Sequence, residues 1–525
     1  MLHTASSYRG MVTAPHHLAA QSGLDVLKDG GSAAEAAVAV AATLAVVYPH
    51  MNSIGGDSFW LVREPGERLH GVHAVGGAAG KAELSLYKGL AAVPWRGPLA
   101  ANTVAGTISG WQAMLDGGTL PLARILRDAI FYAEDGVAVT EGGAAAAVSK
   151  DADLREVAGY GDVFRPDGRP LGVGDRLKQP ALARTLRRLV RDGLEGFYRG
   201  DLARDIAADL EAAGSPVAAA DLEAHAISRP APLQTRLRDA TLYNAAPPTQ
   251  GFASLMILAL YDRLKGEREF APNSFEYVHG LVEATKRAFL LRDRHIGDPL
   301  HMDFDPQALL DDGVALDALA AKIDRQHALP WPQPPSGGDT VWFGVVDGDG
   351  RAVSAIQSIY FEFGSGLVLP QTGIVWQNRG ASFRLAPDGW NALKPGRKPF
   401  HTLNPAMAVF DDGRLMSYGA MGGEGQPQTQ AAVFTRYAGG MGLQAAITAP
   451  RWLLGRTWGE DSVTLKIEDR FDPSLYDALR EAGHLVQLAA PFTSTMGHAG
   501  ALVSHPDGRI DGATDPRSDG GVAAW

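Results

Sequence analysis

Thr340 follows a stretch rich in proline and glycine, Leu329–Gly338 (LPWPQPPSGG), and precedes an apolar run. Such a stretch excludes regular structure and predicts an exposed, mobile segment in which the Asp339–Thr340 bond is open to attack by the Thr340 hydroxyl. An N-terminal threonine carries its own general base, because its α-amine can take the hydroxyl proton. The pKa of an α-amino group, about 7.7–8, suits that task near neutral pH. Cleavage before Thr340 would therefore create a nucleophile.

A β-hairpin is predicted to hold this threonine. Asp339–Val346 and Arg351–Ile359 have the pattern of strands, and Asp347–Gly350 (DGDG) has that of a turn. A three-residue turn would place Ser358 opposite Thr340, whereas a two- or four-residue turn would place the preceding residue there. Ser358 is therefore the candidate for orienting the α-amine.

The chemistry also needs donors for an oxyanion, and Gly422 and Gly423 in the run GAMGGEG are the candidates. Glycine lets the backbone come close to a ligand, so that its N–H groups can stabilise developing negative charge. Each of these features has an ordinary structural interpretation as well, namely a strand threonine, a strand serine and a tight turn. No metal or cofactor is expected, since the chain has no cysteine and no H-E-x-x-H motif.

Helices dominate before the break at Leu329–Gly338, and strands become frequent after it. Two helices are expected within residues 17–48, where Ser32–Glu35 has the S-x-x-E pattern of a capping box and Pro49 ends the second helix. Further helices are expected at 121–135, 181–196, 201–213, 252–265, 275–292, 427–436 and 473–482, and further strands at 366–376, 405–410 and 414–420. This mixture predicts layers of both kinds.

The bulk composition excludes some classes of partner. The chain of 525 residues has 48 basic and 59 acidic side chains, a net charge of −11, which argues against nucleic-acid and anionic-membrane partners. The longest apolar run, Ala36–Val47, is shorter than the roughly 18 residues that suggest a membrane span, so a buried helix is expected there. The first 21 residues lack the apolar region of a secretory signal, and a cytoplasmic location is the default expectation.

Several segments, taken in order, resemble the γ-glutamyltransferase family of N-terminal-nucleophile hydrolases along nearly the whole chain. They are Asn52–Phe59 (NSIGGDSF), Pro247–Gly251, Glu283–Pro299, Asp339–Thr340 with Val345–Asp347, Phe363–Gly366 and Met421–Gly423. The resemblance implies an α+β fold, a four-layer αββα sandwich. It also implies self-cleavage into a large chain, 1–339, and a small chain, 340–525, which stay together as one folded unit, and an acyl-enzyme on Thr340.

Family members that use γ-glutamyl compounds hold the α-carboxylate and α-amine of the substrate with a set of polar residues, and this chain departs from that set. Val75 stands where an arginine is expected, Tyr360 replaces an asparagine, Ser382 replaces an aspartate, and His401-Thr402 replace paired serines. Valine cannot make the bidentate contact of an arginine with a carboxylate, and a serine gives no counter-charge to an ammonium group. The glutamyl-binding set is therefore missing.

The segments PFHTLNPA and MGGEGQPQTQ resemble the acylase and amidohydrolase branch of the family. The expected activity is hydrolysis of a small amide that bears a carboxylate, with oxamate, giving oxalate and ammonia in purine metabolism, as the best candidate. Tyr360, Arg379, His401 and Thr402 are the expected substrate-binding residues. The alternatives are a γ-glutamyltransferase or glutathione hydrolase, a cephalosporin (glutaryl) acylase, and an inactive binding protein. The expected partners are the small amide, the two cleaved chains for each other, and a second copy in a homodimer.

Overall fold

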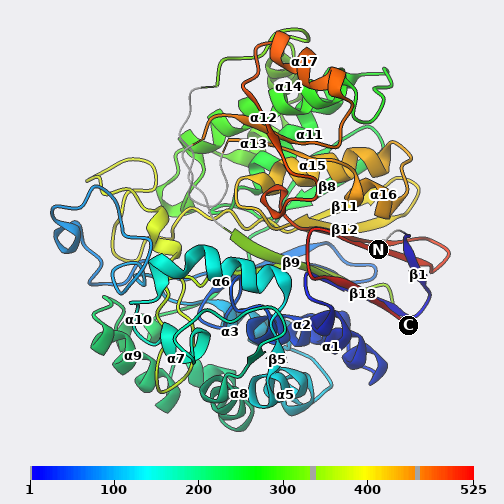
Figure 1. Cartoon of the computed structure of the whole chain (residues 1–525). Helices are drawn as coiled ribbons and strands as arrows, with labels where there is room; N and C mark the ends of the chain where they lie inside the picture. The colour runs from blue at the N-terminus through cyan, green and yellow to red at the C-terminus, as the bar shows by residue number, and fades with distance from the viewer. Residues whose placement is uncertain (1–2, 332–338, 456–461) are drawn as a thin grey trace.

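Two antiparallel sheets face each other in the computed structural model, which describes residues 3–331, 339–455 and 462–525 (Figure 1). The six-stranded sheet has the order β18 (Gly521–Ala524), β2 (Gly10–Ala14), β9 (Asp339–Asp347), β10 (Ala352–Tyr360), β3 (Asp57–Arg63), β4 (His70–Ala74). The seven-stranded sheet has the order β1 (Ala5–Ser7), β17 (Ile510–Thr514), β16 (Ala499–Ser504), β12 (Leu415–Ala420), β11 (Ala406–Phe410), β8 (Ala240–Asn244), β7 (Leu233–Arg236). Helices cover the outer face of each sheet, so the predicted αββα sandwich is confirmed.

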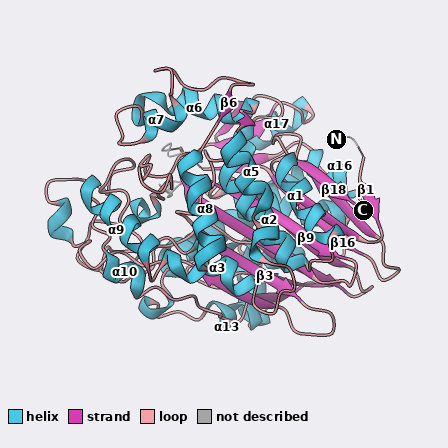
Figure 2. Ribbon diagram, turned by 90° about the horizontal axis from the view of Figure 1, so that it is seen from below, coloured by secondary structure: helices cyan, strands magenta, loops and turns pink. Residues whose placement is uncertain are grey.

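The helices divide into two groups by position in the chain. The first group lies on the side of the six-stranded sheet, where Figure 2 shows α2 and α3 against the strands: α1 (His17–Lys28), α2 (Ala33–Val47), α3 (Thr107–Met114), α4 (Leu122–Ile125), α5 (Arg127–Asp135), α6 (Glu141–Leu154), α7 (Tyr160–Phe164), α8 (Pro180–Asp192), α9 (Asp201–Ala213) and α10 (Ala219–Glu223). The second group lies on the seven-stranded sheet: α11 (Gly251–Lys265), α12 (Phe275–His295), α13 (Pro306–Asp311), α14 (Gly313–Ala320), α15 (Gly425–Ala438), α16 (Leu443–Thr448) and α17 (Pro473–Glu481). Two smaller sheets contain β13 (Trp452–Leu454), β14 (Leu465–Glu468) and β15 (Val486–Ala489), and β5 (Val137–Ala138) and β6 (Arg176–Leu177).

Helix α2 is the buried helix that the apolar run predicts. Its capping box is present, because the Ser32 hydroxyl accepts from the Glu35 N–H at 3.3 Å and the Glu35 carboxylate accepts from the Ser32 N–H at 2.8 Å. Every residue of the helix except Ala34 is buried. Within the ranges given above, no helix is both long and apolar enough to cross a membrane.

The hairpin of β9 and β10 carries two kinds of apolar surface, because side chains alternate between the faces of a strand. Val341 and Phe343 belong to the core under the helices that include α2. Trp342 points to the opposite face and packs with Ile356 and with Leu403, from the segment before β11. Thr340 has the parity of Trp342, so it lies on the face between the two sheets.

Strands from both sides of the expected cleavage point are interleaved. Strand β9 is hydrogen-bonded to β2, and β10 is hydrogen-bonded to β3. The sequence places β2 and β3 in the range 1–339, and β9 continues from Thr340 into the range 340–525. Breaking one peptide bond at Asp339 would leave these ladders intact.

The strand expected at 366–376 is not formed, which corrects that prediction. The segment turns back on itself, since the only bridge described within it joins Val368 to Val375 and Gly373 has a φ of 70°. Pro370 cannot donate to a ladder, and this favours the turn over a strand. The region expected as one helix at 121–135 is divided into α4 and α5. Residues 332–338 of the expected mobile segment lie outside the described residues.

Candidate functional site

Thr340 is the second residue of β9, and its side chain is buried at the end of the strand. In the uncut chain the Thr340 nitrogen is part of the peptide bond to Asp339. The Gln426 side chain, from the first turn of α15, donates to the Thr340 hydroxyl with an Nε2–Oγ1 distance of 3.2 Å. The hydroxyl is therefore held at the meeting point of β9 and the start of α15.

Ser358 lies beside Thr340 because the hairpin has a three-residue turn, closed by the Asp347 N–H donating to the Arg351 carbonyl at 3.1 Å. The ladder pairs Gln357 with Val341 and then passes through a bulge, which contains Ser358. A bulge bends the strand and changes the direction of the side chains near it.

Strand β3, on the other side of β10 from β9, adds a carboxyl group beside Thr340 and Ser358. Ser358 pairs with Asp57 on β3, so Thr340, Ser358 and Asp57 lie on three neighbouring strands. The approach of β3 requires glycine at position 56, since a Cβ there would come within 2.1 Å of the Ser358 carbonyl oxygen.

Gly422 and Gly423 form the turn between β12 and α15. Their φ angles are 127° and 53°, values that favour glycine over other residues. The Gln250 side chain donates to the Gly423 carbonyl at 2.7 Å and to the Thr402 carbonyl at 2.8 Å. Arg292 in turn donates to the Gln250 side-chain oxygen at 2.9 Å. Buried hydrogen bonds thus hold the turn in place. Such rigidity suits the N–H groups of Gly422 and Gly423, because oxyanion donors must be in position before negative charge develops.

Arg379 and Tyr360 are stacked at the bulge. The Arg379 guanidinium carbon lies 3.3 Å from the centre of the Tyr360 ring, and its Nη1 donates to the Thr402 hydroxyl at 3.4 Å. Tyr360 has a φ of 84°, unusual for a residue with a side chain, and the bulge imposes it. Burial lowers the pKa of Arg379, and the nearby Tyr360 and Asp57 oppose that shift.

His401 lies next to Asp57, with 3.5 Å between His401 Nε2 and Asp57 Oδ2. Burial lowers the pKa of His401 well below its usual range, and the Arg379 charge adds to this, so the imidazole is neutral near pH 7. Burial raises the pKa of Asp57 to about 7, against the opposing effect of the N–H donors of Gly106 and Gly76. Any contact that His401 makes with a substrate therefore comes from a neutral ring.

These side chains have polar atoms without hydrogen-bond partners among the residues that the structure describes. They are Arg379 Nε and Nη2, both ring nitrogens of His401, and Asp57 Oδ2. Each unsatisfied buried group typically costs about 1–3 kcal/mol, so a cluster of five points to a ligand or water that completes it. All eight predicted side chains and glycines thus belong to one connected region at the end of β9, β10 and β3.

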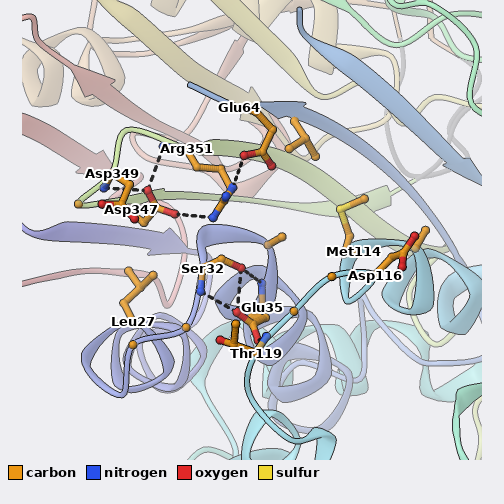
Figure 3. Close-up of a pocket in the computed structure, with 18 of the residues that line it drawn as sticks. Leu27, Ser32, Glu35, Glu64, Met114, Asp116, Thr119, Asp347, Asp349 and Arg351 are labelled. Atoms are coloured by element: carbon orange, nitrogen blue, oxygen red, sulfur yellow. Dashed lines mark hydrogen bonds and ion pairs between the residues drawn. The ribbon is translucent and has the colours of Figure 1, made fainter. Parts of the chain in front are cut away.

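A separate pocket, of about 820 Å³, lies at the other end of the hairpin (Figure 3). There Arg351 pairs with Glu64 and with Asp347, and Glu35 accepts from the Ser32 and Thr119 backbones. Arg351, Glu64, Asp347 and Glu35 thus have partners among the residues around the pocket. The residues predicted to act in hydrolysis lie at the Thr340 end of the hairpin and do not line this pocket.

Sequence reasoning assigned no role to several residues of the site. Asp57, Gln250 and Arg292 stand inside the segments that resemble the family, and Glu424 directly follows Gly423, but their partners come from distant segments. Gln426 follows the glycine turn, and Arg292, buried and 3.4 Å from Glu424, lies in α12. The signal available in the sequence was a polar residue inside a segment that resembles the family or beside its glycine turn.

One histidine and glutamate cluster away from Thr340 has a spacing that a metal ion could use: ligand atoms of His279, Glu283 and His484 lie within 4.8 Å of one another. The two imidazoles, however, are joined by a hydrogen bond of 2.9 Å, and Lys286 pairs with Glu283 at 2.7 Å. These groups satisfy one another, and we assign no metal site to them.

Comparison with known proteins places this geometry in a family. Residues 19–525 match the family described as Gamma-glutamyltranspeptidase. The chain is 55% identical to the oxamate amidohydrolase proenzyme of Klebsiella pneumoniae subsp. pneumoniae over 526 residues, 99% of each chain. It is 42% identical to the glutathione hydrolase-like YwrD proenzyme of Bacillus subtilis, over 97% of each chain.

A comparison with solved structures agrees with this family assignment. The cephalosporin acylase of Bacillus halodurans has a crystal structure that matches with a TM-score of 0.91 and 34% identity, covering 99% of this chain and 97% of that one. The expected resemblance and the expected enzyme class, an N-terminal-nucleophile amide hydrolase, are confirmed. The chain belongs to the gamma-glutamyltranspeptidase family.

Proposed function

We propose that the protein is a self-processing amidohydrolase that uses Thr340 to hydrolyse a short amide bearing a carboxylate, with oxamate as the best candidate. The observation that carries this proposal is Arg379, a buried cation with unpartnered donors beside the row of Thr340, Ser358 and Asp57. In addition, the residues that would bind a γ-glutamyl group are replaced; for example, Val75 stands where an arginine is expected. The similarity to an oxamate amidohydrolase proenzyme supports the same substrate.

Self-processing would produce a large chain, 1–339, and a small chain, 340–525. The shared sheet supports their continued association, because β2 and β3 of the large chain hold β9 and β10 of the small one through backbone hydrogen bonds. The names of the two relatives, both given as proenzymes, agree with this maturation.

The mechanism follows from the positions of the groups. In the mature enzyme the α-amine of Thr340, oriented by Ser358, takes the hydroxyl proton while the oxygen attacks the amide carbon. The N–H groups of Gly422 and Gly423 stabilise the oxyanion. The α-ammonium then gives its proton to the amide nitrogen, the C–N bond breaks and ammonia leaves, and water hydrolyses the acyl-enzyme on Thr340 in a second round of the same steps. With oxamate the products are oxalate and ammonia.

Substrate preference is the direct test. We expect the mature enzyme to give a higher kcat/KM for oxamate than for a γ-glutamyl anilide or a glutaryl amide, because Arg379 can pair with a carboxylate while the γ-glutamyl set is absent. Steady-state rates for the three compounds, measured on one preparation, decide the question. A higher value for the γ-glutamyl compound would favour a glutathione hydrolase, and a higher value for the glutaryl amide would favour an acylase.

Arg379→Ala is expected to lower kcat/KM for oxamate roughly 100-fold, in the range found when a buried charged partner is removed. Oxamide, the neutral diamide, should lose less than about fivefold, since it has no carboxylate to bind. Arg384→Ala is the matched control, because Arg384 is exposed and stacks on Trp390 away from Thr340. Equal losses for the two substrates would remove Arg379 from the carboxylate site.

A cytoplasmic location, a homodimer and a place in purine metabolism stay predictions from the sequence. A small-molecule substrate and the association of two processed chains agree with the names of the relatives. The acidic net charge of −11 continues to argue against a nucleic-acid partner.

A further inference from the structure

The two carboxyl oxygens of Asp57 have different surroundings. Oδ1 accepts from the Gly106 N–H at 3.0 Å and from the Gly76 N–H at 3.3 Å. Oδ2 has no hydrogen-bond partner among the described residues, and it faces His401 Nε2 across 3.5 Å, longer than a normal N–H···O bond. Oδ2 is therefore the oxygen that can take up a proton or contact a ligand.

Titratable groups that act on Asp57 or on His401 come from several segments. They are Arg379 after β10, His401 before β11, His73 on β4, Tyr198 after α8, and Lys398 near His401. Burial lowers the pKa of His73 to about 3 and raises that of Tyr198, so both are neutral near pH 7. Ser358, which pairs with Asp57 from β10, carries no charge. With Asp57 ionised, its charge is balanced by that of Arg379.

A substrate carboxylate that enters this cluster adds one negative charge to a buried site. An uncompensated buried charge is strongly disfavoured. A proton taken up on Asp57 Oδ2 restores the balance and turns that oxygen into a donor for the substrate. Burial already raises the pKa of Asp57 to about 7, so this carboxyl can take up a proton near neutral pH.

We propose that Asp57 is a specificity residue that binds the substrate carboxylate in its neutral acid form, so that each anionic substrate enters together with one proton. This assignment rests on the proposed function, because it concerns the carboxylate of the same substrate. Oδ2–H donates to one carboxylate oxygen, and the free donors of Arg379 bind the other. The site thereby selects short monoanions, and a neutral amide gains nothing from the proton.

The affinity for an anionic substrate should fall as the pH rises. Asp57 is neutral below pH 7 and ionised above it, so affinity for an anion is full at low pH and falls as the pH rises. If only the protonated form binds, affinity falls roughly 50-fold between pH 7 and pH 9. The Asp57→Asn variant should bind anions with less than about threefold change over that range, because an amide N–H₂ is a permanent donor and Oδ1 still accepts from Gly106 and Gly76. At pH 9 the variant should therefore bind more tightly than the wild type, a gain that loss of a structural contact would not produce.

Calorimetric titration of the mature, two-chain enzyme with pyruvate tests this, since pyruvate has a methyl group where oxamate has its amide nitrogen. Titrations at pH 8 in two buffers of different ionisation enthalpy should give close to one proton taken up per pyruvate in the wild type and none in Asp57→Asn. Pyruvamide, the neutral analogue, should bind without proton uptake in both. Asp347→Asn is the control, because Asp347 is a buried carboxyl at the far end of the hairpin whose pKa burial also raises (Figure 3). It should keep the wild-type uptake.

Pyruvate binding without proton uptake in the wild type would overturn the proposal, as would the same uptake in Asp57→Asn, which would assign the proton to the α-amine of Thr340. If Asp57→Asn does not fold, the uncleaved Thr340→Ala chain serves instead, because it has no α-amine at that position. Proton uptake there supports Asp57, and its absence contradicts the proposal. A separate result would contradict the proposed function: the wild type would hydrolyse no oxamate, whether or not pyruvate binding takes up a proton.

Discussion

Thr340→Ala should yield a single uncut chain of 525 residues that hydrolyses no amide, where the wild type is expected to yield chains of 339 and 186 residues. The same hydroxyl is expected to break the Asp339–Thr340 bond and to attack the substrate, so one substitution removes both reactions. Loss of a nucleophile typically lowers kcat on the order of 10⁴–10⁶-fold. Intact-mass measurement and an ammonia-release assay follow the two effects separately, and Thr340→Ser should retain part of each.

The matched control is Thr13→Ala on the neighbouring strand β2. Thr13 is a buried threonine whose hydroxyl donates to the Ala513 carbonyl at 3.2 Å. It lies on a strand next to β9 but has no proposed part in cleavage or catalysis. This variant should still be cut and active. Cleavage after residue 339 in Thr340→Ala would mean that another group attacks the bond, and an active uncut wild type would contradict the mechanism altogether.

Gly423→Ala should lower kcat about 10²–10³-fold while KM changes little. An alanine is poorly tolerated at a φ of 53°, so the turn shifts and its N–H groups leave the position of the oxyanion. Donors of this kind act in the transition state, and this is why turnover should suffer more than binding. Steady-state kinetics with oxamate, together with a thermal-unfolding curve, provide the measurement.

Gly440→Ala separates this effect from general backbone strain. Gly440 has a φ of 91° at the end of α15, and a Cβ there would meet no atom within 4 Å. It should therefore destabilise the fold as a left-handed glycine replacement does, with kcat unchanged. A similar fall in kcat for both variants, or an equal loss in kcat and in binding for Gly423→Ala, would remove the turn from the oxyanion role.

Several features of the fold follow from short stretches of sequence. The capping box of Ser32 and Glu35 joins residues three apart, and the three-residue turn after Asp347 sets the register that carries Ser358 to Thr340. The prediction of a strand at 366–376 was wrong for a related reason. That segment is apolar enough for a strand, but Pro370 and the turn at Gly373 redirect the chain. Apolar character alone does not settle how a short segment pairs.

The sequence by itself predicted the nucleophile, the glycine turn and the missing glutamyl-binding residues, since each is recognised from neighbouring residues or from motif order. Tertiary structure decided the rest of the site. Asp57 gains its raised pKa and its facing His401 only because β3 pairs with β10, some three hundred residues later. Gln250 likewise reaches Gly423 only when the helices close on the seven-stranded sheet. Burial and hydrogen-bond partners are properties of the segments that surround a residue in space, and local spacing along the chain does not contain them.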